Sequence, residues 1–253
     1  MMNIERHQKI HSILKNKGNV SIAELHEELG VSEMTIRRDL KLLSEEGVLK
    51  RVHGGATIRP VVGETPFVER VIVNRGLKQA ITGFAITHIA PNDTVFIDGS
   101  TTCSEMAEKL PENMDITVFT NNMDAILKLR RKSRISVISF GGDLAKDGNT
   151  FDGLMAVENA EKIIVDKCFI SASGFTETEI LNAGMVGTQV KKAMIRNSRK
   201  TFLLADSTKY SGSGVIKVCK WEDVDAFICD ALLPDNLKYR FENLVAETYF
   251  VEV

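Results

Sequence analysis

A turn rich in small polar residues joins an apolar run to a helical segment in VFIDGSTTCSEM, residues 95–106. The N–H groups in the first turn of a helix have no partner inside the helix, and the helix dipole adds positive potential there. Such a helix start, with hydroxyl groups on Ser100, Thr101 and Thr102, is suited to hold a phosphate dianion. The same turn could also be a plain helix cap, so this stretch alone leaves both interpretations open.

Four other apolar runs are followed by similar polar clusters, TNN at 120–122, GG at 141–142, SASG at 171–174 and DSTK at 206–209. Each cluster alone is weak evidence, because an Asp and a Lys three residues apart are often a surface salt bridge. Ligands of open α/β sheets bind at the carboxyl ends of the strands, where five such clusters would converge on one cleft.

The chemistry of that cleft predicts a phosphorylated sugar or polyol. Asp98 and Asp206 can accept hydrogen bonds from sugar hydroxyls, Lys191 and Lys209 can neutralise an anion, and a Gly-Gly pair permits close backbone approach. The chain has neither GxxxxGK nor GxGxxG, which disfavours a nucleotide. The predicted effector-binding residues are Asp98, Gly99, Ser100, Thr101, Thr102, Thr120, Asn121, Gly141, Gly142, Lys191, Asp206 and Lys209.

The elements that would position these residues alternate from residue 77 onward. Val-, Ile- and Phe-rich runs separated by amphipathic segments are typical of a mostly parallel sheet covered on both faces. We expect strands at 94–98, 116–120, 135–140, 168–172, 201–205 and 226–230, and helices at 78–89, 102–110, 122–130 and 188–198.

The first sixty residues predict three short helices, at about 5–16, from Ser21, and from Ser32 to about Glu46. Ser21 and Glu24 fit a capping box, and Ile36, Leu40 and Leu43 form the inner stripe of the third helix. This pattern, followed by a β-like run and a turn at 48–55, indicates a helix-turn-helix with a wing. The second helix of such a motif enters the major groove. The predicted DNA-binding residues are Ser32, Met34, Thr35, Arg37, Arg38, Arg51 and His53.

A plainer interpretation of the third helix stays open on charge alone. Arg37 and Arg38 could form a solvated face paired with Glu33 or Asp39. The net charge of the whole chain is −2, and the N-terminal 59 residues are only slightly basic.

The composition of the 253 residues, 43% hydrophobic and 26% charged, is that of a globular protein with a sizeable core. The four cysteines lack the close spacing of a zinc or redox site, so we expect no metal and no cofactor. The N-terminus has no apolar signal core and no run approaches 18 apolar residues, which predicts a cytoplasmic protein without a membrane partner.

The stretch VSEMTIRRDLKLLSEEGVLKRVHGGA resembles the N-terminal signature of the DeoR family of bacterial transcriptional regulators. Further matches are ETPFVER, DGSTT, VFTNN, ISFGG, DKCFI, VKKAMI and LADSTKY. The resemblance implies a winged helix-turn-helix joined to an effector domain similar in fold to ribose-5-phosphate isomerase. One departure is that the family usually has Asp-Ser-Gly-Thr-Thr, whereas Gly99 and Ser100 reverse the middle pair, so Ser100 would offer the hydroxyl.

An isomerase of this fold needs a carboxylate base, and the isomerases that the chain resembles carry acids after the strand corresponding to CFISA. Here SASGF at 171–175 has none, and Gln189 stands in the following helix. Glu177 and Glu179 lie nearby in the sequence and keep an enzyme hypothesis open. We expect no catalytic residues and no enzyme.

The sequence therefore predicts three parts: a DNA-binding domain at 1–57, a linker at 58–76 and a sugar-phosphate sensor domain at 77–253. The predicted function is repression of a carbohydrate-utilisation operon, relieved by a phosphorylated sugar. The expected partners are double-stranded operator DNA, the effector, and further copies of the chain in a dimer or tetramer.

Overall fold

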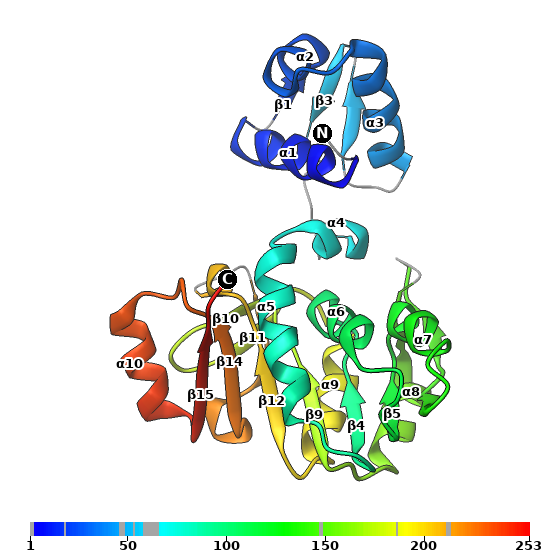
Figure 1. Ribbon diagram of the computed structural model, residues 1–253, viewed down its shortest axis with the longest axis vertical. Helices are drawn as coiled ribbons and strands as arrows, with labels where there is room; N and C mark the ends of the chain where they lie inside the picture. The colour runs from blue at the N-terminus through cyan, green and yellow to red at the C-terminus, as the bar shows by residue number, and fades with distance from the viewer. Residues whose placement is uncertain are drawn as a thin grey trace. The chain divides into compact units, whose positions relative to one another are not determined.

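The structure is a computed structural model that describes residues 3–17, 19–45, 49–52, 54–57, 66–146, 149–185, 187–210 and 214–253. The chain divides into two compact units, residues 1–73 and 74–253 (Figure 1). The predicted linker spans this division, and its residues 58–65 lie outside the described ranges. Its remainder contains the helix α4 (Phe67–Ile72) and the first residues of α5 (Arg75–Ala85). The domain limits drawn from the sequence stay a prediction.

The first unit is built on three helices, α1 (Asn3–Lys17), α2 (Ile22–Leu29) and α3 (Glu33–Glu45). The predicted capping box of α2 is confirmed, since the backbone N–H of Glu24 donates to Ser21 Oγ at 3.1 Å and that of Ser21 donates to the Glu24 carboxylate at 2.8 Å. The predicted stripe of α3 is fully buried against the other two helices. The helix-turn-helix is thus held by an apolar core.

A three-stranded antiparallel sheet forms the wing of this unit, with the order β1 (Asn19–Ser21), β3 (Gly55–Thr57), β2 (Lys50–Val52). A Cβ atom on Gly55 would lie 2.1 Å from the carbonyl oxygen of Val20, so only glycine permits β1 and β3 to pair at this register. The structure therefore confirms the wing that the sequence predicts after the third helix.

The second unit contains a seven-stranded, all-parallel sheet in the order β15-β14-β12-β9-β4-β5-β6. The strands are β4 (Thr94–Ile97), β5 (Ile116–Thr120), β6 (Ile135–Ser139), β9 (Lys167–Ile170), β12 (Thr201–Leu204), β14 (Ala226–Asp230) and β15 (Glu247–Val251). The mostly parallel α/β fold expected from the sequence is confirmed.

Helices cover both faces of this sheet, and α5 crosses one of them in Figure 1. That face packs on α5, α6 (Thr101–Lys109) and α7 (Met123–Leu129), while the other packs on α8 (Gly153–Glu161), α9 (Thr188–Arg196) and α10 (Asp235–Leu244). Alternate side chains of each strand point to opposite faces and enter the two apolar cores. The polar residues of the predicted clusters follow the strands, beyond these apolar stretches.

Several elements were not predicted from the sequence. They are α4, α8, α10, β15, the hairpin of β7 (Asp143–Leu144) and β8 (Phe151–Asp152), a small sheet of β10 (Gly174–Phe175), β11 (Ile180–Asn182) and β13 (Ile216–Cys219), and 3-10 turns at Ile86–His88, Ser207–Lys209 and Trp221–Asp223. Among the described helices, none is both long and apolar enough to cross a bilayer.

Candidate effector site and DNA-reading surface

The order in which the chain adds strands to the sheet reverses between the neighbouring strands β4 and β9. From β4 the chain runs to β5 and β6 on one side, and then returns to β9, β12 and β14 on the other. The carboxyl ends of β4 and β9 therefore form a topological switch point, where open α/β sheets bind their ligands. The five predicted clusters follow β4, β5, β6, β9 and β12, which are neighbours in this sheet.

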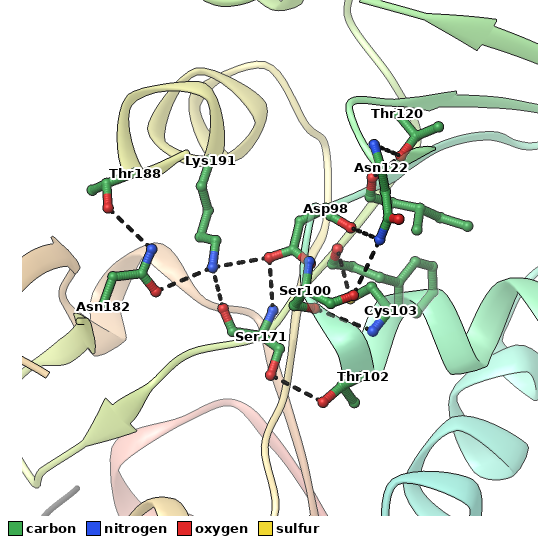
Figure 2. A network of polar contacts seen from close by, with 12 residues as sticks. Asp98, Ser100, Thr102, Cys103, Thr120, Asn122, Ser171, Asn182, Thr188 and Lys191 are labelled. Carbon is green, nitrogen blue, oxygen red and sulfur yellow. Dashed lines mark hydrogen bonds and ion pairs between the residues drawn. The ribbon is translucent and has the colours of Figure 1, made fainter. Parts of the chain in front are cut away.

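Asp98, the first residue after β4, is the centre of a polar network at the switch point (Figure 2). One carboxylate oxygen accepts the backbone N–H of Ser100 at 2.9 Å, and the other accepts that of Ser171 at 3.1 Å. Lys191 reaches from α9 to the same carboxylate, with an Nζ–Oδ2 distance of 2.9 Å. The pair is nearly sealed from solvent, with side-chain exposures of 1% for Asp98 and 9% for Lys191.

The other contacts of Lys191 tie it to the second half of the sheet. Its ammonium group donates to the carbonyl oxygen of Ser171 and, at 3.3 Å, to Asn182 Oδ1. The amide of Asn182 in turn donates to Thr188 Oγ1 at 3.0 Å. The sequence did not single out Asn182 or Thr188, because their contacts depend on how β11 lies beside α9 and no spacing rule signals them.

The network keeps Asp98 ionised despite its burial. Desolvation raises the pKa of this carboxyl group, but the charge of Lys191 and the hydrogen bonds from Ser100 and Ser171 lower it by more, so the pKa lies below its ordinary value. Asp98 and Lys191 therefore neutralise each other. Less of the Lys191 charge remains for an anion than the sequence suggested.

Ser100 caps α6, and Gly99 packs tightly behind it. The Oγ of Ser100 accepts the backbone N–H of Cys103 at 3.1 Å. A Cβ atom on Gly99 would lie 2.5 Å from Thr150 Cγ2, so the glycine is required by the segment that crosses over the turn. The cap takes up the Ser100 hydroxyl oxygen as an acceptor, which leaves the first N–H groups of α6, at Thr101 and Thr102, as the anion donors of this turn.

The end of β5 is joined to the same turn through its side chains. Thr120 Oγ1 donates to the carbonyl oxygen of Ile97 at 2.6 Å, and the amide of Asn122 donates to the carbonyl oxygens of Asp98 and Ser100, each at 3.1 Å. Asn121 is buried beside Gly99, and its Oδ1 atom has no hydrogen-bond partner among the described residues. Asn121 thus offers an acceptor next to the predicted phosphate turn.

The two glycines after β6 differ in what they do. Gly141 has open space where a Cβ atom would lie, whereas a Cβ atom on Gly142 would meet the carbonyl oxygen of Asp152 at 2.4 Å. Gly142 therefore serves the packing of β8, and only Gly141 is placed as an open approach for a ligand. Asp152 was not predicted from the sequence, although it is buried and accepts a hydrogen bond from Thr150 at 2.8 Å.

The DSTK cluster after β12 is joined to different neighbours. Asp206 is buried, and its Oδ1 atom accepts hydrogen bonds from Thr208 Oγ1 and from the side-chain amide of Asn74. The backbone N–H of Ser207 donates to Asp230 Oδ2 at 2.7 Å, and that of Lys209 donates to the carbonyl oxygen of Asp206 at 2.9 Å. The hydrogen bonds of this cluster to Asn74 and Asp230 place it at a second position along the strand ends, after β12.

The four cysteines are kept as thiols. Burial raises the pKa of Cys103, Cys168, Cys219 and Cys229, to about 12 for Cys219. Cys103, beside the phosphate turn, donates its thiol hydrogen to the carbonyl oxygen of Phe169 at 3.3 Å. Among the described residues, no group of three His, Cys, Asp or Glu side chains is arranged to hold a metal ion.

The exposed face of α3 carries most of the predicted DNA-binding residues. Met34 is 75% exposed, Arg37 and Arg38 are exposed, and Ser32 caps the helix with its Oγ 3.3 Å from the Thr35 nitrogen. In the wing, Arg51 is exposed on β2. His53 lies outside the described residues. Ser32, Thr35 and the two arginines share the helix start that a helix-turn-helix inserts into the major groove.

The structure separates the two pairings that the sequence left open for this face. Arg37 contacts Glu33 at 3.1 Å in an exposed i,i+4 pair, which is worth little in water. Asp39 faces inward, where its carboxylate accepts Arg6 and contacts His7 Nε2 at 3.2 Å. Asp39 is thus occupied in holding α1 to α3 and does not neutralise the outward arginines. Among the described residues, Arg38 forms no ion pair.

The chain combines a winged helix-turn-helix with an α/β unit whose switch point is suited to an anion. This combination is typical of transcriptional regulators that have a DNA-binding domain and a ligand-sensing domain. Two family models match the chain: the DeoR-like helix-turn-helix domain over residues 6–60 and the DeoR C terminal sensor domain over residues 73–231. The chain belongs to the DeoR family of transcriptional regulators.

Several curated relatives span nearly the whole chain. The "Uncharacterized HTH-type transcriptional regulator YulB" of Bacillus subtilis is 37% identical and covers 94% of this chain and 93% of its own. The "Transcriptional repressor AccR" of Agrobacterium fabrum is 31% identical and covers 94% of this chain and 96% of its own. The "Glycerol-3-phosphate regulon repressor" of Escherichia coli is 29% identical and covers 92% of this chain and 93% of its own.

Solved structures give weaker likenesses to the sensor unit's fold. Ribose 5-phosphate isomerase A from Methanocaldococcus jannaschii has a TM-score of 0.41 and 16% identity, covering 54% of this chain and 55% of its own. The eIF2B delta structure from Chaetomium thermophilum has a TM-score of 0.45 and 12% identity, covering 64% and 57%.

Proposed function

We propose that this protein represses a carbohydrate-utilisation operon and releases its operator when a phosphorylated sugar or polyol binds the sensor unit. The observation that carries the proposal is the start of α6 at the switch point of a unit that follows a winged helix-turn-helix. There the backbone N–H groups of Thr101 and Thr102 and the Thr101 hydroxyl follow a turn that the Asp98 network fixes, and we propose that they bind the anion together.

Repression is supported by the names of two relatives that align along almost the whole chain. One is a transcriptional repressor and the other is a repressor of a glycerol-3-phosphate regulon. A phosphorylated polyol in the second description fits the class of effector that the α6 turn favours. The effector of this chain is proposed here only as a class.

The acid groups near the cleft support a sensor over an isomerase. Asp98 is committed to Lys191, and Glu179 pairs with Lys217 at 2.6 Å. Glu177 pairs with Arg240 and accepts the Tyr210 hydroxyl at 3.3 Å. A base for proton transfer must reach the substrate carbon, and these carboxylates are held by other partners.

Relief of repression requires that the effector bind the DNA-free state more tightly than the DNA-bound state. Linkage then makes DNA weaken effector binding by the same factor. Helix-turn-helix proteins read paired half-sites, so we propose a homodimer or homotetramer working in the cytoplasm.

The proposal is tested by a thermal-shift screen of the full chain against phosphorylated sugars and polyols, followed by gel shifts with DNA upstream of its own operon. The matched pair is Thr101→Ala, which removes a hydroxyl at the phosphate turn, and Thr117→Ala, a threonine on β5 outside the proposed site. Thr101→Ala should lose the effector response and keep DNA binding, whereas Thr117→Ala should keep both. Turnover of a sugar phosphate by the purified protein, or no salt-sensitive binding to that DNA, would refute the proposal.

A further inference from the structure

Asn74 is the first residue of the sensor unit and directly follows Val73, the last residue of the DNA-binding unit. It stands at the start of α5 with φ +55°, in the left-handed region that asparagine tolerates better than most residues. Among the described residues, only Asn92 shares a positive φ without being glycine. The chain therefore enters the sensor unit through a residue with an uncommon backbone conformation.

The side chain of Asn74 does not cap the helix that it begins. An asparagine at this position ordinarily accepts a backbone N–H of the first helical turn, and here no such hydrogen bond forms. Its amide nitrogen donates instead to Thr208 Oγ1 at 2.8 Å and to Asp206 Oδ1 at 3.2 Å. The amide thus joins the entrance of the sensor unit to the DSTK segment at the end of β12.

The helix α6, whose start is the predicted phosphate turn, also contacts the first turns of α5. Glu105 lies on this helix and is buried. Its carboxylate accepts the side-chain amide of Gln79 at 2.8 Å and lies 3.6 Å from Arg75 Nε. The DSTK segment, through Asn74, and α6, through Arg75 and Gln79, therefore both contact the start of α5 next to the joint between the units.

We infer that Asn74 is a coupling residue, through which occupancy of the effector site reaches the joint with the DNA-binding unit. Asp206 is both a proposed acceptor for effector hydroxyls and an acceptor of the Asn74 amide. An effector that hydrogen-bonds the Asp206–Thr208 segment competes with the Asn74 amide for Asp206 Oδ1 and Thr208 Oγ1. When the Asn74 amide loses these acceptors, the start of α5 is no longer tied to the end of β12. The inference rests on the proposed function and adds the residue that carries its signal.

The variant that tests this inference is Asn74→Gly. Glycine adopts φ +55° without strain, so the change removes the amide and keeps the backbone conformation. Asn92→Gly makes the same change at φ +69°, at an exposed turn before β4, and is the matched control. The probe is the phosphorylated sugar or polyol that shifts the wild-type melting temperature most in the screen above, because it carries both the phosphate that the α6 turn would recognise and the hydroxyls that Asp206 would accept.

Two quantities are measured on the full-length variants: the thermal shift with this probe, and operator affinity by fluorescence anisotropy with the probe or with potassium chloride at matched ionic strength. In the wild type and in Asn92→Gly, we expect the probe to weaken operator binding at least about fivefold, at the low end of usual allosteric couplings. In Asn74→Gly we expect the thermal shift to persist and the weakening to fall below about twofold.

Retention of the full response to the probe in Asn74→Gly would overturn the inference while leaving the proposed function intact. Loss of the thermal shift in Asn74→Gly would also overturn it, since the residue would then shape the site and not its coupling. A wild-type chain that binds no operator, or whose operator affinity no phosphorylated sugar or polyol of the screen changes, contradicts the proposed function, and the coupling fails with it.

Discussion

The buried pair of Asp98 and Lys191 makes the phosphate turn depend on one electrostatic contact. Removing one member of a buried pair leaves the other charge uncompensated, which costs about 3–5 kcal/mol. We therefore expect Asp98→Asn to lower the free energy of unfolding by about that amount at pH 7, measured by urea denaturation. The control is Asp115→Asn, which removes a half-exposed partner of Arg134 and should cost about 0–1 kcal/mol.

The same pair predicts a pH dependence with a definite sign. The folded-state pKa of Asp98 lies below its value in the unfolded chain, which is about 3.9 for an aspartate. Its stabilisation is complete above the unfolded value and is lost as the pH falls through the folded value. The stability difference between wild type and Asp98→Asn should therefore shrink below about pH 4. A difference that stays constant down to pH 3 would contradict the assigned role.

At Gly99 the prediction concerns steric packing, because the residue lies close to Thr150. Gly99→Ala places a methyl group against Thr150 Cγ2, and overpacking of this kind costs about 1–3 kcal/mol. Thr150→Ser removes that methyl group and keeps the hydroxyl bonded to Asp152. The double variant should therefore regain most of the stability lost by Gly99→Ala, measured by thermal unfolding. Additive losses in the double variant would show that the backbone of the turn, and not Thr150, demands glycine.

Sequence alone reached the polar residues of the site but not their partners. The turn at 99–102 was visible because a glycine, three hydroxyl residues and a following helix are local features. The pairing of Asp98 with Lys191 joins residues 93 positions apart, and the Asn74 contacts join residues more than 130 apart. Contacts at such separations are set by strand order, which composition and periodicity do not determine.

At the scale of elements, the wing depends on close approach of two strands. Gly55→Ala would push a methyl group into the Val20 carbonyl, which is backbone and cannot rotate away. We expect this variant to lose operator binding while the sensor unit keeps its thermal shift with the phosphorylated probe, because the two units are separately compact. Gly54→Asn is the control, since Gly54 has φ +80° with open space around it, and it should bind DNA.

The recognition helix makes the second prediction at this scale. Arg38→Ala should weaken operator binding by about 1–3 kcal/mol if the side chain reads a base, and Arg37→Ala by a similar amount. Glu33→Gln frees Arg37 from its exposed partner and should not weaken binding. Unchanged footprints in both arginine variants would remove α3 from the DNA interface.

Elements with local signals were predicted well, and those without were missed. The capping box of α2 and the stripe of α3 are short-range patterns, and both are confirmed. In α8 the large apolar residues Leu154 and Met155 are exposed and the buried ones are Ala156 and Ala160, so its sequence shows no clear apolar face. Its structure follows from packing on the sheet, which supplies what local propensity does not.

At the scale of the whole molecule, the chain joins a DNA-reading unit to a ligand-binding unit with a net charge of −2. DNA affinity then depends on the local arginines of the first unit and should fall with added salt as counterions are released. The joint at Val73 and Asn74 lies where the chain passes from one unit to the other, which is where the proposed coupling would act.

The central claim is tested most directly by operator binding of the full chain, measured with and without a phosphorylated sugar at matched ionic strength. The account predicts that the compound giving the largest thermal shift weakens operator binding at least about fivefold, by the reciprocity of linkage. Operator affinity that is unchanged by every phosphorylated compound able to shift the melting temperature would contradict it.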